Sequence, residues 1–253
     1  MFVKGFPGAA IPANCFVLAP ADGEECVVVD PGIGVLDRLA EVLREHRLRP
    51  AAVLLTHGHV DHVYSVTPVC GGHGVAAHVH ADDRYRLHDP YANLDPALVA
   101  MLEQEFGRRD SWVEPEDVVT VAHGDRLDVA GLTLDVAHVP GHTEGCLMFT
   151  LPGIPDDPRS ADPYGAADGV ADATATVLTG DVLFAGSIGR TDLPGSDPAL
   201  MRRSLRERVL TLPDDTLVLP GHGPTTTIGR ERVRNPFLVE LVGEDGGAPG
   251  EGE

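Results

Sequence analysis

The sequence predicts an α/β fold that carries metal-binding side chains at the ends of its strands. Short apolar runs of strand length alternate along the chain with segments whose apolar residues recur at helical spacing. Four of the apolar runs end at a glycine, proline or other turn residue beside a histidine or an aspartate. The chain of 253 residues is long enough for one large domain, or two small ones, with a substantial core.

The first half of the chain predicts strands and helices in turn. A β-branched run that stops at the turn residues Asp30, Pro31 and Gly32 predicts a strand, and helically spaced apolar residues follow it. Asp95 followed by Pro96 predicts a helix start, because an aspartate caps a helix and proline suits its first turn. The expected strands are residues 26–29, 51–55 and 75–79, and the expected helices are 35–47 and 96–106.

The second half repeats this pattern. Residues 127–139 alternate in polarity around Gly131, as the two strands of a hairpin would. Asp197 and Pro198 predict a further helix start, with apolar residues at helical spacing as far as Leu210. Further strands are expected at residues 146–151, 175–179 and 217–219.

Two segments of biased composition fall outside the pattern. Residues 152–174 are rich in Gly, Ala, Asp and Pro and predict an exposed, mobile hairpin loop inserted in the domain. Residues 243–253 predict an acidic, disordered tail. We therefore expect a single domain over residues 1–242.

The charge and the cysteines limit the class of protein. Against 19 basic residues there are 39 acidic ones, and the formal charge of −20 disfavours nucleic acid and anionic membranes as partners. No apolar stretch has the length of a membrane span and no signal-peptide pattern opens the chain, so we expect a cytoplasmic protein. The scattered cysteines predict buried thiols rather than disulfides: Cys15, Cys26, Cys70 and Cys146.

The side chains at the strand ends are of the type that binds divalent metal ions. The segment 56–62 alone places three imidazoles and one carboxylate directly after a buried run. A polar cluster at the end of a buried strand costs free energy unless its groups are paired or bound to a cation. Imidazole and carboxylate are the usual ligands of zinc and related metals. The predicted metal ligands are His57, His59, Asp61, His62, His142, Asp181 and His222.

These motifs resemble the signature of the metallo-β-lactamase fold hydrolases. The string His57-x-His59-x-Asp61-His62 is similar to the first motif of that superfamily, and the later motifs match in order at Gly141-His142-Thr143, Gly180-Asp181 and Gly221-His222-Gly223. Within the superfamily, the chain most resembles the glyoxalase II-like branch, the thioester hydrolases of the hydroxyacylglutathione hydrolase type. That resemblance rests on residues 140–145, 187–195, 220–226 and 235–237.

The resemblance implies an αβ/βα sandwich, in which two mixed sheets lie face to face with helices outside. It also implies two divalent metal ions, zinc in the first place, with iron and manganese as alternatives. Carried over by position, His57, His59 and His142 would hold the first ion. The second ion would be held by Asp61, His62 and His222, and Asp181 would bridge the two.

The expected reaction is hydrolysis of a small-molecule thioester, an S-acyl or hydroxyacyl conjugate of a thiol, by a metal-bound hydroxide. The chain has no G-x-S-x-G motif, so water is the expected nucleophile. Asp61 is the expected catalytic residue, which would orient the water and accept its proton. A thiolate leaves readily, so no strong general acid is required. Two cations in an acidic protein would also attract a substrate that carries a carboxylate.

Other reactions occur on similar sites. The first alternative is a persulfide dioxygenase, a branch that holds a single iron by two histidines and one aspartate and consumes oxygen. The residues 187–195 and the complete set of seven ligands favour the hydrolase instead. Hydrolysis of β-lactams is disfavoured by the absence of a signal peptide pattern, and RNA processing by the acidic charge.

The motifs identify no substrate-binding residue. The longer glyoxalase II enzymes hold glutathione with basic residues of a helical C-terminal region, which has no match here beyond residues 237–242. The thiol half of the substrate could therefore be glutathione, another small thiol or coenzyme A. In the loop after Asp181 we expect Arg190 and Asp192 to form a salt bridge, and we expect His138 to have a structural role.

Overall fold

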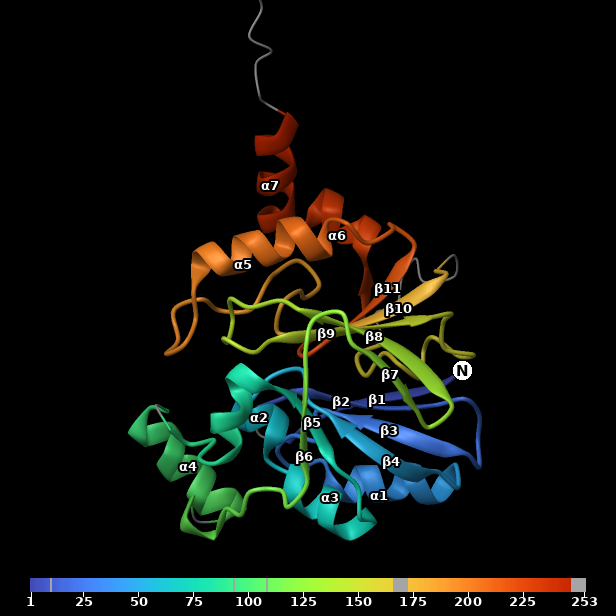
Figure 1. Cartoon of the computed structure of the whole chain (residues 1–253), viewed down its shortest axis with the longest axis vertical. Coiled ribbons are helices and arrows are strands. Elements are labelled where there is room, and N and C mark those ends of the chain that lie inside the picture. The colour runs from blue at the N-terminus through green and yellow to red at the C-terminus, as the bar shows by residue number, and fades with distance from the viewer. Residues whose placement is uncertain (10, 93, 108, 166–172, 247–253) are drawn as a thin grey trace, which may run out of the picture.

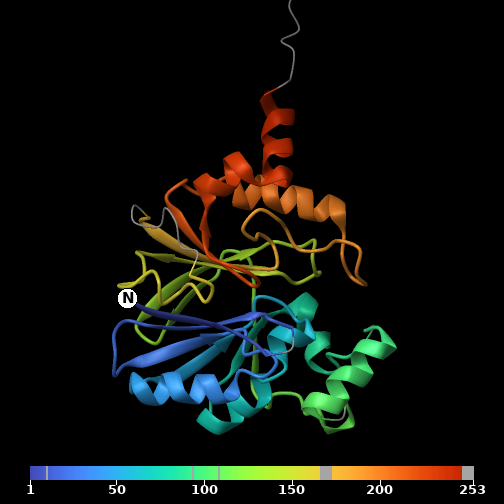
Figure 2. The ribbon, with the colours of Figure 1, turned by 180° about the vertical axis from the view of Figure 1, so that it is seen from behind.

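Two β-sheets face each other and helices cover their outer faces, as Figures 1 and 2 show. The structure is a computed structural model that describes residues 1–9, 11–92, 94–107, 109–165 and 173–246. In the described part of the chain each sheet has six strands. The predicted αβ/βα sandwich is confirmed.

The first sheet comes from the N-terminal half, in strand order β1-β2-β3-β4-β5-β6. Strands β1 to β3 are antiparallel, and β3 to β6 run parallel to one another. Its strands are β1 (Phe2–Pro7), β2 (Asn14–Ala19), β3 (Glu25–Val29), β4 (Arg49–Leu54), β5 (Ala77–His80) and β6 (Val118–Val121).

The second sheet comes from the C-terminal half, in strand order β12-β11-β10-β9-β8-β7. All of its neighbouring strands are antiparallel except the parallel pair β10 and β11. Its strands are β7 (Arg126–Val129), β8 (Leu132–His138), β9 (Leu147–Pro152), β10 (Ala175–Gly180), β11 (Thr216–Pro220) and β12 (Thr226–Thr227).

The core between the sheets follows from the two-residue period of a strand. In β2, Phe16 and Leu18 pack between the sheets, whereas Cys15 and Val17 face the helices on the outside. Phe149 and Leu217 of the second sheet belong to the same cluster as Phe16 and Leu18. Burial of each such side chain stabilises the fold by about 1.5–3 kcal/mol.

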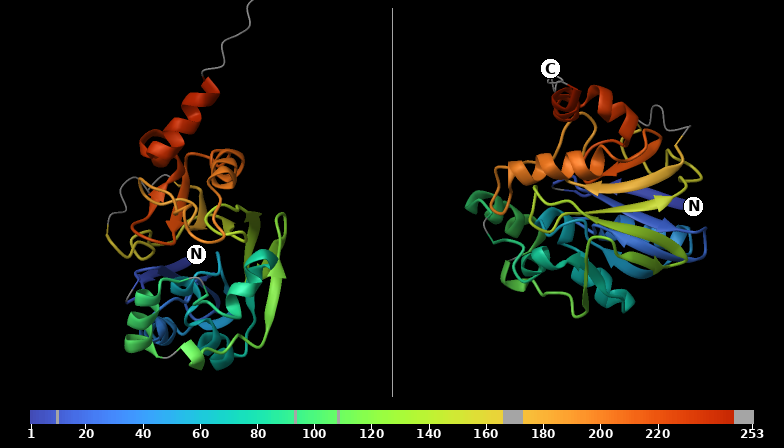
Figure 3. Two further views of the ribbon diagram at one scale, coloured as in Figure 1. Left: turned by 90° about the vertical axis from the view of Figure 1, so that its left-hand side faces the viewer. Right: turned by 45° about the horizontal axis from the view of Figure 1, so that its top comes forward.

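Helices cover the outer faces of both sheets (Figure 3). Residues of α1 and α3 pack on the first sheet, and residues of α5, α6 and α7 pack on the second. The described helices are α1 (Leu36–Glu45), α2 (Val60–Val63), α3 (Val66–His73), α4 (Pro96–Phe106), α5 (Pro198–Ser204), α6 (Ile228–Arg234) and α7 (Pro236–Gly246). Short 3-10 helices η1 (Ala81–Leu87) and η2 (Arg109–Ser111) and a π-helical turn η4 (Leu205–Val209) complete the set.

The predicted strands and helix starts are confirmed, with differences of at most two residues at their ends. The side chains of Asp95 and Asp197 accept hydrogen bonds from the first turns of α4 and α5, as expected of caps. The sequence interpretation had no helix or strand at β1, β2, β6, β12, α2, α3, α6 or α7. Among the described helices, none combines the length and the apolar character needed to span a bilayer.

Two predictions about the biased segments need correction. Residues 152–174 do connect the antiparallel strands β9 and β10, but part of the segment is not exposed. Ala161 is buried in the core between the sheets, and the amide of Gly5 in β1 donates to the carbonyl of the preceding Ser160 at 2.9 Å. The predicted tail begins too early, since α7 continues to Gly246. The predicted mobility of residues 166–172 and disorder of 247–253 concern positions outside the described residues.

Candidate metal centre

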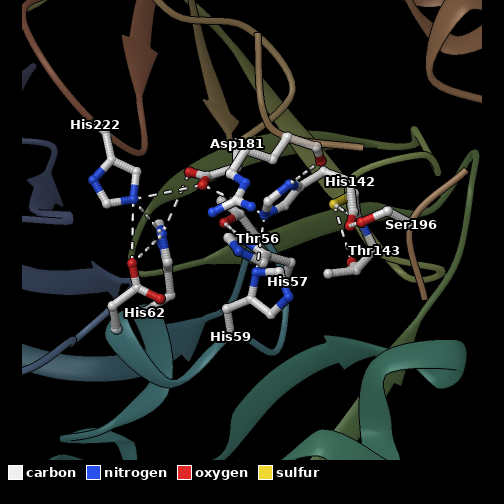
Figure 4. A network of polar contacts seen from close by, with 12 residues as sticks. Thr56, His57, His59, His62, His142, Thr143, Asp181, Ser196 and His222 are labelled. Atoms are coloured by element: carbon white, nitrogen blue, oxygen red, sulfur yellow. Dashed lines mark hydrogen bonds and ion pairs between the residues drawn. The ribbon is translucent and has the colours of Figure 1, made fainter. Parts of the chain in front are cut away.

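The seven predicted ligands meet at one edge of the sandwich, between the two sheets. Figure 4 labels all of them except Asp61. The first sheet contributes four of them from the segment that follows β4, where the short helix α2 carries Asp61 and His62. The second sheet contributes the other three. His142 follows β8, Asp181 follows β10 and His222 follows β11.

The ligands form two groups of three. The possible ligand atoms of His57, His59 and His142 lie within 4.8 Å of one another, as do those of Asp61, His62 and His222. In the first group, His59 Nδ1 lies 2.9 Å from His142 Nε2. In the second group, His62 Nε2 lies 3.3 Å from His222 Nε2. These are the two triads that the resemblance implied.

Asp181 lies between the two groups. Its Oδ1 is 3.4 Å from His62 Nε2, and its Oδ2 is 3.4 Å from His142 Nε2. Asp181 Oδ2 is also 3.5 Å from His222 Nε2. One carboxylate therefore faces ligands of both groups, which is the arrangement that a bridging ligand requires.

Hydrogen bonds on the outer side of the rings fix which nitrogen faces the centre. His142 Nδ1 donates to the carbonyl of Arg190 at 2.8 Å, and His222 Nδ1 donates to the carbonyl of Pro12 at 3.1 Å. His62 Nδ1 donates to Asp30 Oδ2 at 2.9 Å. Because these Nδ1 atoms carry the hydrogen, a neutral ring presents the lone pair of Nε2 to the centre.

His57 supplies an independent sign that the site is built for a cation. Its ring is fully buried, and Nε2 has no hydrogen-bond partner in the described part of the chain. Asp181 Oδ1 is likewise buried without a hydrogen bond to any described residue. An unpaired buried acceptor costs about 1–3 kcal/mol. A divalent cation satisfies both atoms, so the residues present fit the metal ions that the resemblance implies.

The electrostatics of the two groups differ. Burial lowers the pKa of His57 well below its ordinary value, and burial with the neighbouring His142 lowers the pKa of His59 to about 3. Both rings are therefore neutral, as metal ligation requires. Burial also lowers the pKa of His62, but the carboxylates of Asp181 and Asp61 outweigh it and hold this pKa well above its ordinary value. The second group thus has the stronger negative field.

Asp30 is a site residue that the sequence interpretation treated only as a turn. It accepts hydrogen bonds from the amide of Thr56 at 2.8 Å and from Thr56 Oγ1 at 2.6 Å, besides the one from His62. These bonds hold Asp30 at a φ of 49°, a conformation that aspartate tolerates better than most residues. Asp30 directly follows the buried strand β3, so the strand-end pattern that found the ligands also applied to it.

Asp83 is a second residue that sequence reasoning missed. It is fully buried in η1, and its Oδ2 accepts from the amide of Gly58 at 2.8 Å and from Thr143 Oγ1 at 2.7 Å. Its Oδ1 accepts from the amide of Gly145 at 2.9 Å. One carboxylate therefore ties the ligand segment of the first sheet to that of the second.

The centre opens onto a cavity of about 360 Å³. Asp61 and His222 lie on its wall with 14% and 26% of their side chains exposed, whereas His62 is fully buried behind them. Arg190 and Asp192, at the rim, form the predicted salt bridge through two hydrogen bonds of 2.9 Å. Away from the centre, His138 Nε2 donates to the carbonyl of Glu144 at 2.8 Å, in line with a structural role.

Sequence relatives extend over almost the whole chain. The family model of the metallo-beta-lactamase superfamily matches residues 8–153. An uncharacterised protein of Mycobacterium tuberculosis (strain ATCC 25618 / H37Rv) is 40% identical over 242 residues, which cover 95% of this chain and 99% of that protein. The hydroxyacylglutathione hydrolase GloC of Haemophilus influenzae is 30% identical over 243 residues, which cover 94% of this chain and 98% of GloC.

Solved structures agree. The crystal structure of the B3 metallo-beta-lactamase BLEG-1 superimposes with a TM-score of 0.71 at 33% identity, over 94% of this chain and 99% of that one. The di-iron-bound form of TTHA1623 superimposes with a TM-score of 0.68 at 32% identity, over 92% and 99% of the two chains. With this fold, these histidine and aspartate groups and these relatives, the chain belongs to the metallo-beta-lactamase superfamily of metal-binding hydrolases.

Proposed function

We propose that this protein is a metal-dependent thioester hydrolase of the glyoxalase II type, which cleaves an S-acyl or hydroxyacyl conjugate of a small thiol. The observation that carries the proposal is the pair of ligand triads joined by Asp181 at the wall of a cavity. The similarity to GloC supports a thioester as the substrate. The expected partner is this small molecule, and neither nucleic acid nor a membrane.

The residues that would hold the metal ions follow from the two groups. His57, His59 and His142 would hold one ion. The other would be held by Asp61, His62 and His222, with Asp181 shared between the two. When bound, two divalent cations, zinc in our proposal, would lower the pKa of a water molecule and polarise the carbonyl of the thioester.

Asp61 is the proposed proton acceptor. Burial raises the pKa of its carboxyl, but His62 and His222 outweigh burial and hold the pKa below its ordinary value. The group is therefore a carboxylate near neutral pH. Its Oδ2 lies 3.2 Å from His222 Nε2, and the side chain reaches the cavity wall. A carboxylate held there can orient a water molecule toward the substrate carbonyl and accept its proton.

The described cavity wall supports water as the nucleophile. Among the described residues that line it there is no serine, threonine, cysteine or lysine. The nearby thiol of Cys146 is buried, and burial raises its pKa well above the ordinary value of a thiol, so it is not a thiolate. A thiolate leaving group needs no strong acid, which makes a thioester a better match for this wall than an amide.

The competing proposal is a persulfide dioxygenase with a single iron. Such a site needs only two histidines and one aspartate. Here the ligand atoms of the second triad also lie within 4.8 Å of one another, and Asp181 faces both triads. A site with a single iron would not use the ligands of the second group, so the geometry favours the hydrolase.

One experiment separates the two functions. The purified protein, loaded in turn with zinc, iron and manganese, would be offered a panel of thioesters and a persulfide while thiol release and oxygen uptake are recorded. We expect thiol release without oxygen uptake. Oxygen uptake with the persulfide, and no thioester cleavage with any metal, would establish the competing function instead.

The variant Asp61→Asn tests the proposed proton acceptor. We expect kcat to fall by about 10²–10⁴-fold, the usual contribution of a positioned base. Asp37→Asn, an exposed position on α1, is the matched control and should keep the wild-type rate. A wild-type rate in Asp61→Asn would remove Asp61 from the mechanism.

A further inference from the structure

The cavity beside the centre has a largely apolar wall that comes from several separate segments. Leu98 lies on α4, and Leu94 lies in the turn before this helix. Phe184 and Ile188 come from the loop after Asp181. Ile11 and Leu193 also line the cavity. All six are half-buried, so part of each side chain is exposed. The apolar residues share one cavity with Asp61 and His222, where the reaction would occur.

Arg86, one of the two arginines among the described lining residues, is already paired with the carboxylates of Glu144 and Asp83. Only 8% of its side chain is exposed. Its guanidinium donates to Glu144 Oε2 at 2.6 Å and to the carbonyl of Pro194 at 3.3 Å, and its Nε lies 3.4 Å from Asp83 Oδ1. If Arg86 turned away to bind a substrate, the buried carboxylate of Asp83 would lose this ion-pair partner, which would cost free energy.

Arg190, the other arginine of the lining, belongs to the rim. Its side chain is 67% exposed and pairs with Asp192. The single lysine of the sequence, Lys4, lies on β1 and does not line the cavity. An anionic group of the substrate would therefore find no unpaired cation in the described wall, apart from the metal centre itself. Placement of a carboxylate against apolar side chains without a partner costs free energy.

We infer that the substituent flanking the thioester bond is apolar and uncharged. This inference rests on the proposed function and narrows it to aliphatic or aromatic thioesters of a neutral thiol arm, rather than conjugates of the anionic tripeptide glutathione. A carboxylate directly beside the scissile carbonyl can still face the cations. It is the substituent on the apolar wall that must lack charge.

The rate should then depend on the length of the acyl chain. Each methylene that enters the cavity contributes about fourfold in binding, from the free energy of its removal from water. With acetyl, butyryl and hexanoyl thioesters of N-acetylcysteamine, a neutral thiol, kcat/KM should rise at that rate until the cavity is full. The N-acetylcysteamine ester should also react at least as fast as the glutathione ester of the same acyl group. A flat series, or a tenfold preference for glutathione, would overturn the inference.

Helix α4 provides a matched pair of variants. Leu98 lines the cavity, whereas Met101 lies on the same helix, is 42% exposed and is not part of the wall. Leu98→Glu should abolish the dependence on chain length, and Met101→Glu should retain it. Leu193→Gln, in a loop outside the described helices and strands, gives a second wall variant in case Leu98→Glu fails to fold. Retention of the full dependence in both wall variants would refute the assignment of the wall.

Binding of uncleavable analogues separates this inference from the proposed function. Calorimetric titration of the metal-loaded protein with S-alkyl thioethers of N-acetylcysteamine measures the affinity of the apolar wall for alkyl chains in the absence of any reaction. Affinity that rises about fourfold per methylene, and falls in the wall variants, supports the apolar site even if no thioester is hydrolysed. In that case only the proposed reaction fails. Affinity that is independent of chain length refutes the apolar site even if thioesters are cleaved.

Discussion

At the scale of single residues, the centre depends on side chains that never reach the cavity. Asp83 accepts hydrogen bonds from the amides of Gly58 and Gly145 and from Thr143. Gly58 and Thr143 are next to proposed ligands, and Gly145 is three residues after one. These contacts fix the distance between the segment that follows β4 and the segment that follows β8. A ligand set spread over two sheets needs such a brace, because small shifts separate the donors.

The variant Asp83→Asn tests this role. An amide keeps the shape but turns one acceptor into a donor, which then faces a donor of the protein. We expect the metal affinity to fall by about 10–100-fold, the usual effect of losing a residue that orients ligands. Competition with a chelator measures it. The control is Asp37→Asn, at an exposed position on α1, which should bind metal as the wild type does. Equal affinities in the two variants would contradict the proposed brace.

Gly221 and Gly223 give contrasting predictions on either side of His222. A Cβ at Gly221 would lie 2.2 Å from Asp181 Oδ1, so Gly221→Ala should displace the proposed bridging carboxylate and reduce the metal content. A Cβ at Gly223 would contact nothing within 4 Å, but its φ is 74°. Gly223→Ala should therefore lower stability by about 1–2 kcal/mol and leave the metal content unchanged. Elemental analysis and chemical denaturation distinguish the two, and a reversed pattern would refute the argument.

The residue types at the strand ends sufficed to predict which side chains would gather. Histidine and aspartate next to glycine, directly after a buried run, have few other uses. The assignment of residues to two ions came only from the family resemblance, because spacing along the chain does not tell which loops face each other. Asp83 was missed for a related reason. Its partners are backbone amides and a hydroxyl, and no sequence pattern marks them.

At the scale of elements, an uninterrupted apolar run decided which strands could be recognised from the sequence. Val27, Val28 and Val29 form a continuous apolar run, and the strand was predicted there. In β2, Asn14 opens the strand and donates through Nδ2 to the carbonyls of Pro220 and Gly223, which links it to the His222 loop. Because this first residue is polar and close to Pro12, the strand was not predicted from the sequence. The helical pattern after Asp197 was right in extent, but the structure changes from α-helix to a π-helical turn at Leu205.

Helix α6 is held to the site loop by one buried carboxylate. Glu231 is 1% exposed, and its Oε2 accepts from the amide of Gly186 at 2.7 Å and from Asn235 Nδ2 at 3.0 Å. Its Oε1 accepts from Thr226 Oγ1 at 2.6 Å. The loop that contains Gly186 also carries Phe184 and Ile188 to the cavity. The position of α6 therefore influences the apolar wall.

We predict that Glu231→Ala destabilises the protein by about 3 kcal/mol, because it removes a buried carboxylate that accepts from the Gly186 amide, Thr226 Oγ1 and Asn235 Nδ2. The free energy of unfolding, from urea denaturation, measures this loss. Glu240→Ala removes a carboxylate of α7 that is 60% exposed and pairs with Arg202, and it should cost less than about 0.5 kcal/mol. Similar losses in the two variants would show that burial of Glu231 does not matter.

At the scale of the whole molecule, the centre joins the two halves of the chain. Four proposed ligands follow a strand of the first sheet and three follow strands of the second, so bound metal would connect the sheets at one edge. The opposed arrangement of the sheets was predictable only through the resemblance. Which strand pairs with which depends on contacts between residues far apart in sequence, and local periodicity carries no information about them.

Removal of metal should therefore lower the stability of the entire fold. A ligand at a thousand times its dissociation constant adds about 4 kcal/mol to the native state. For a domain of this size, that corresponds to a fall in Tm of roughly 10 °C when a chelator is added. Scanning calorimetry measures it. The Asp181→Ala variant, which we expect to lack metal, should show no such response, and an equal fall there would mean that the chelator acts elsewhere.

The most direct test of the central claim is the metal content of the purified protein, measured by elemental analysis after loading with zinc, iron or manganese. The claim is that seven side chains from two sheets hold two cations, with Asp181 between them. Wild type and Asp192→Ala, which alters an exposed carboxylate of the same loop, should each hold two ions per chain. Asp181→Ala should lose them. A wild-type protein that retains none of these metals, or an Asp181→Ala variant that keeps both ions, would contradict the account.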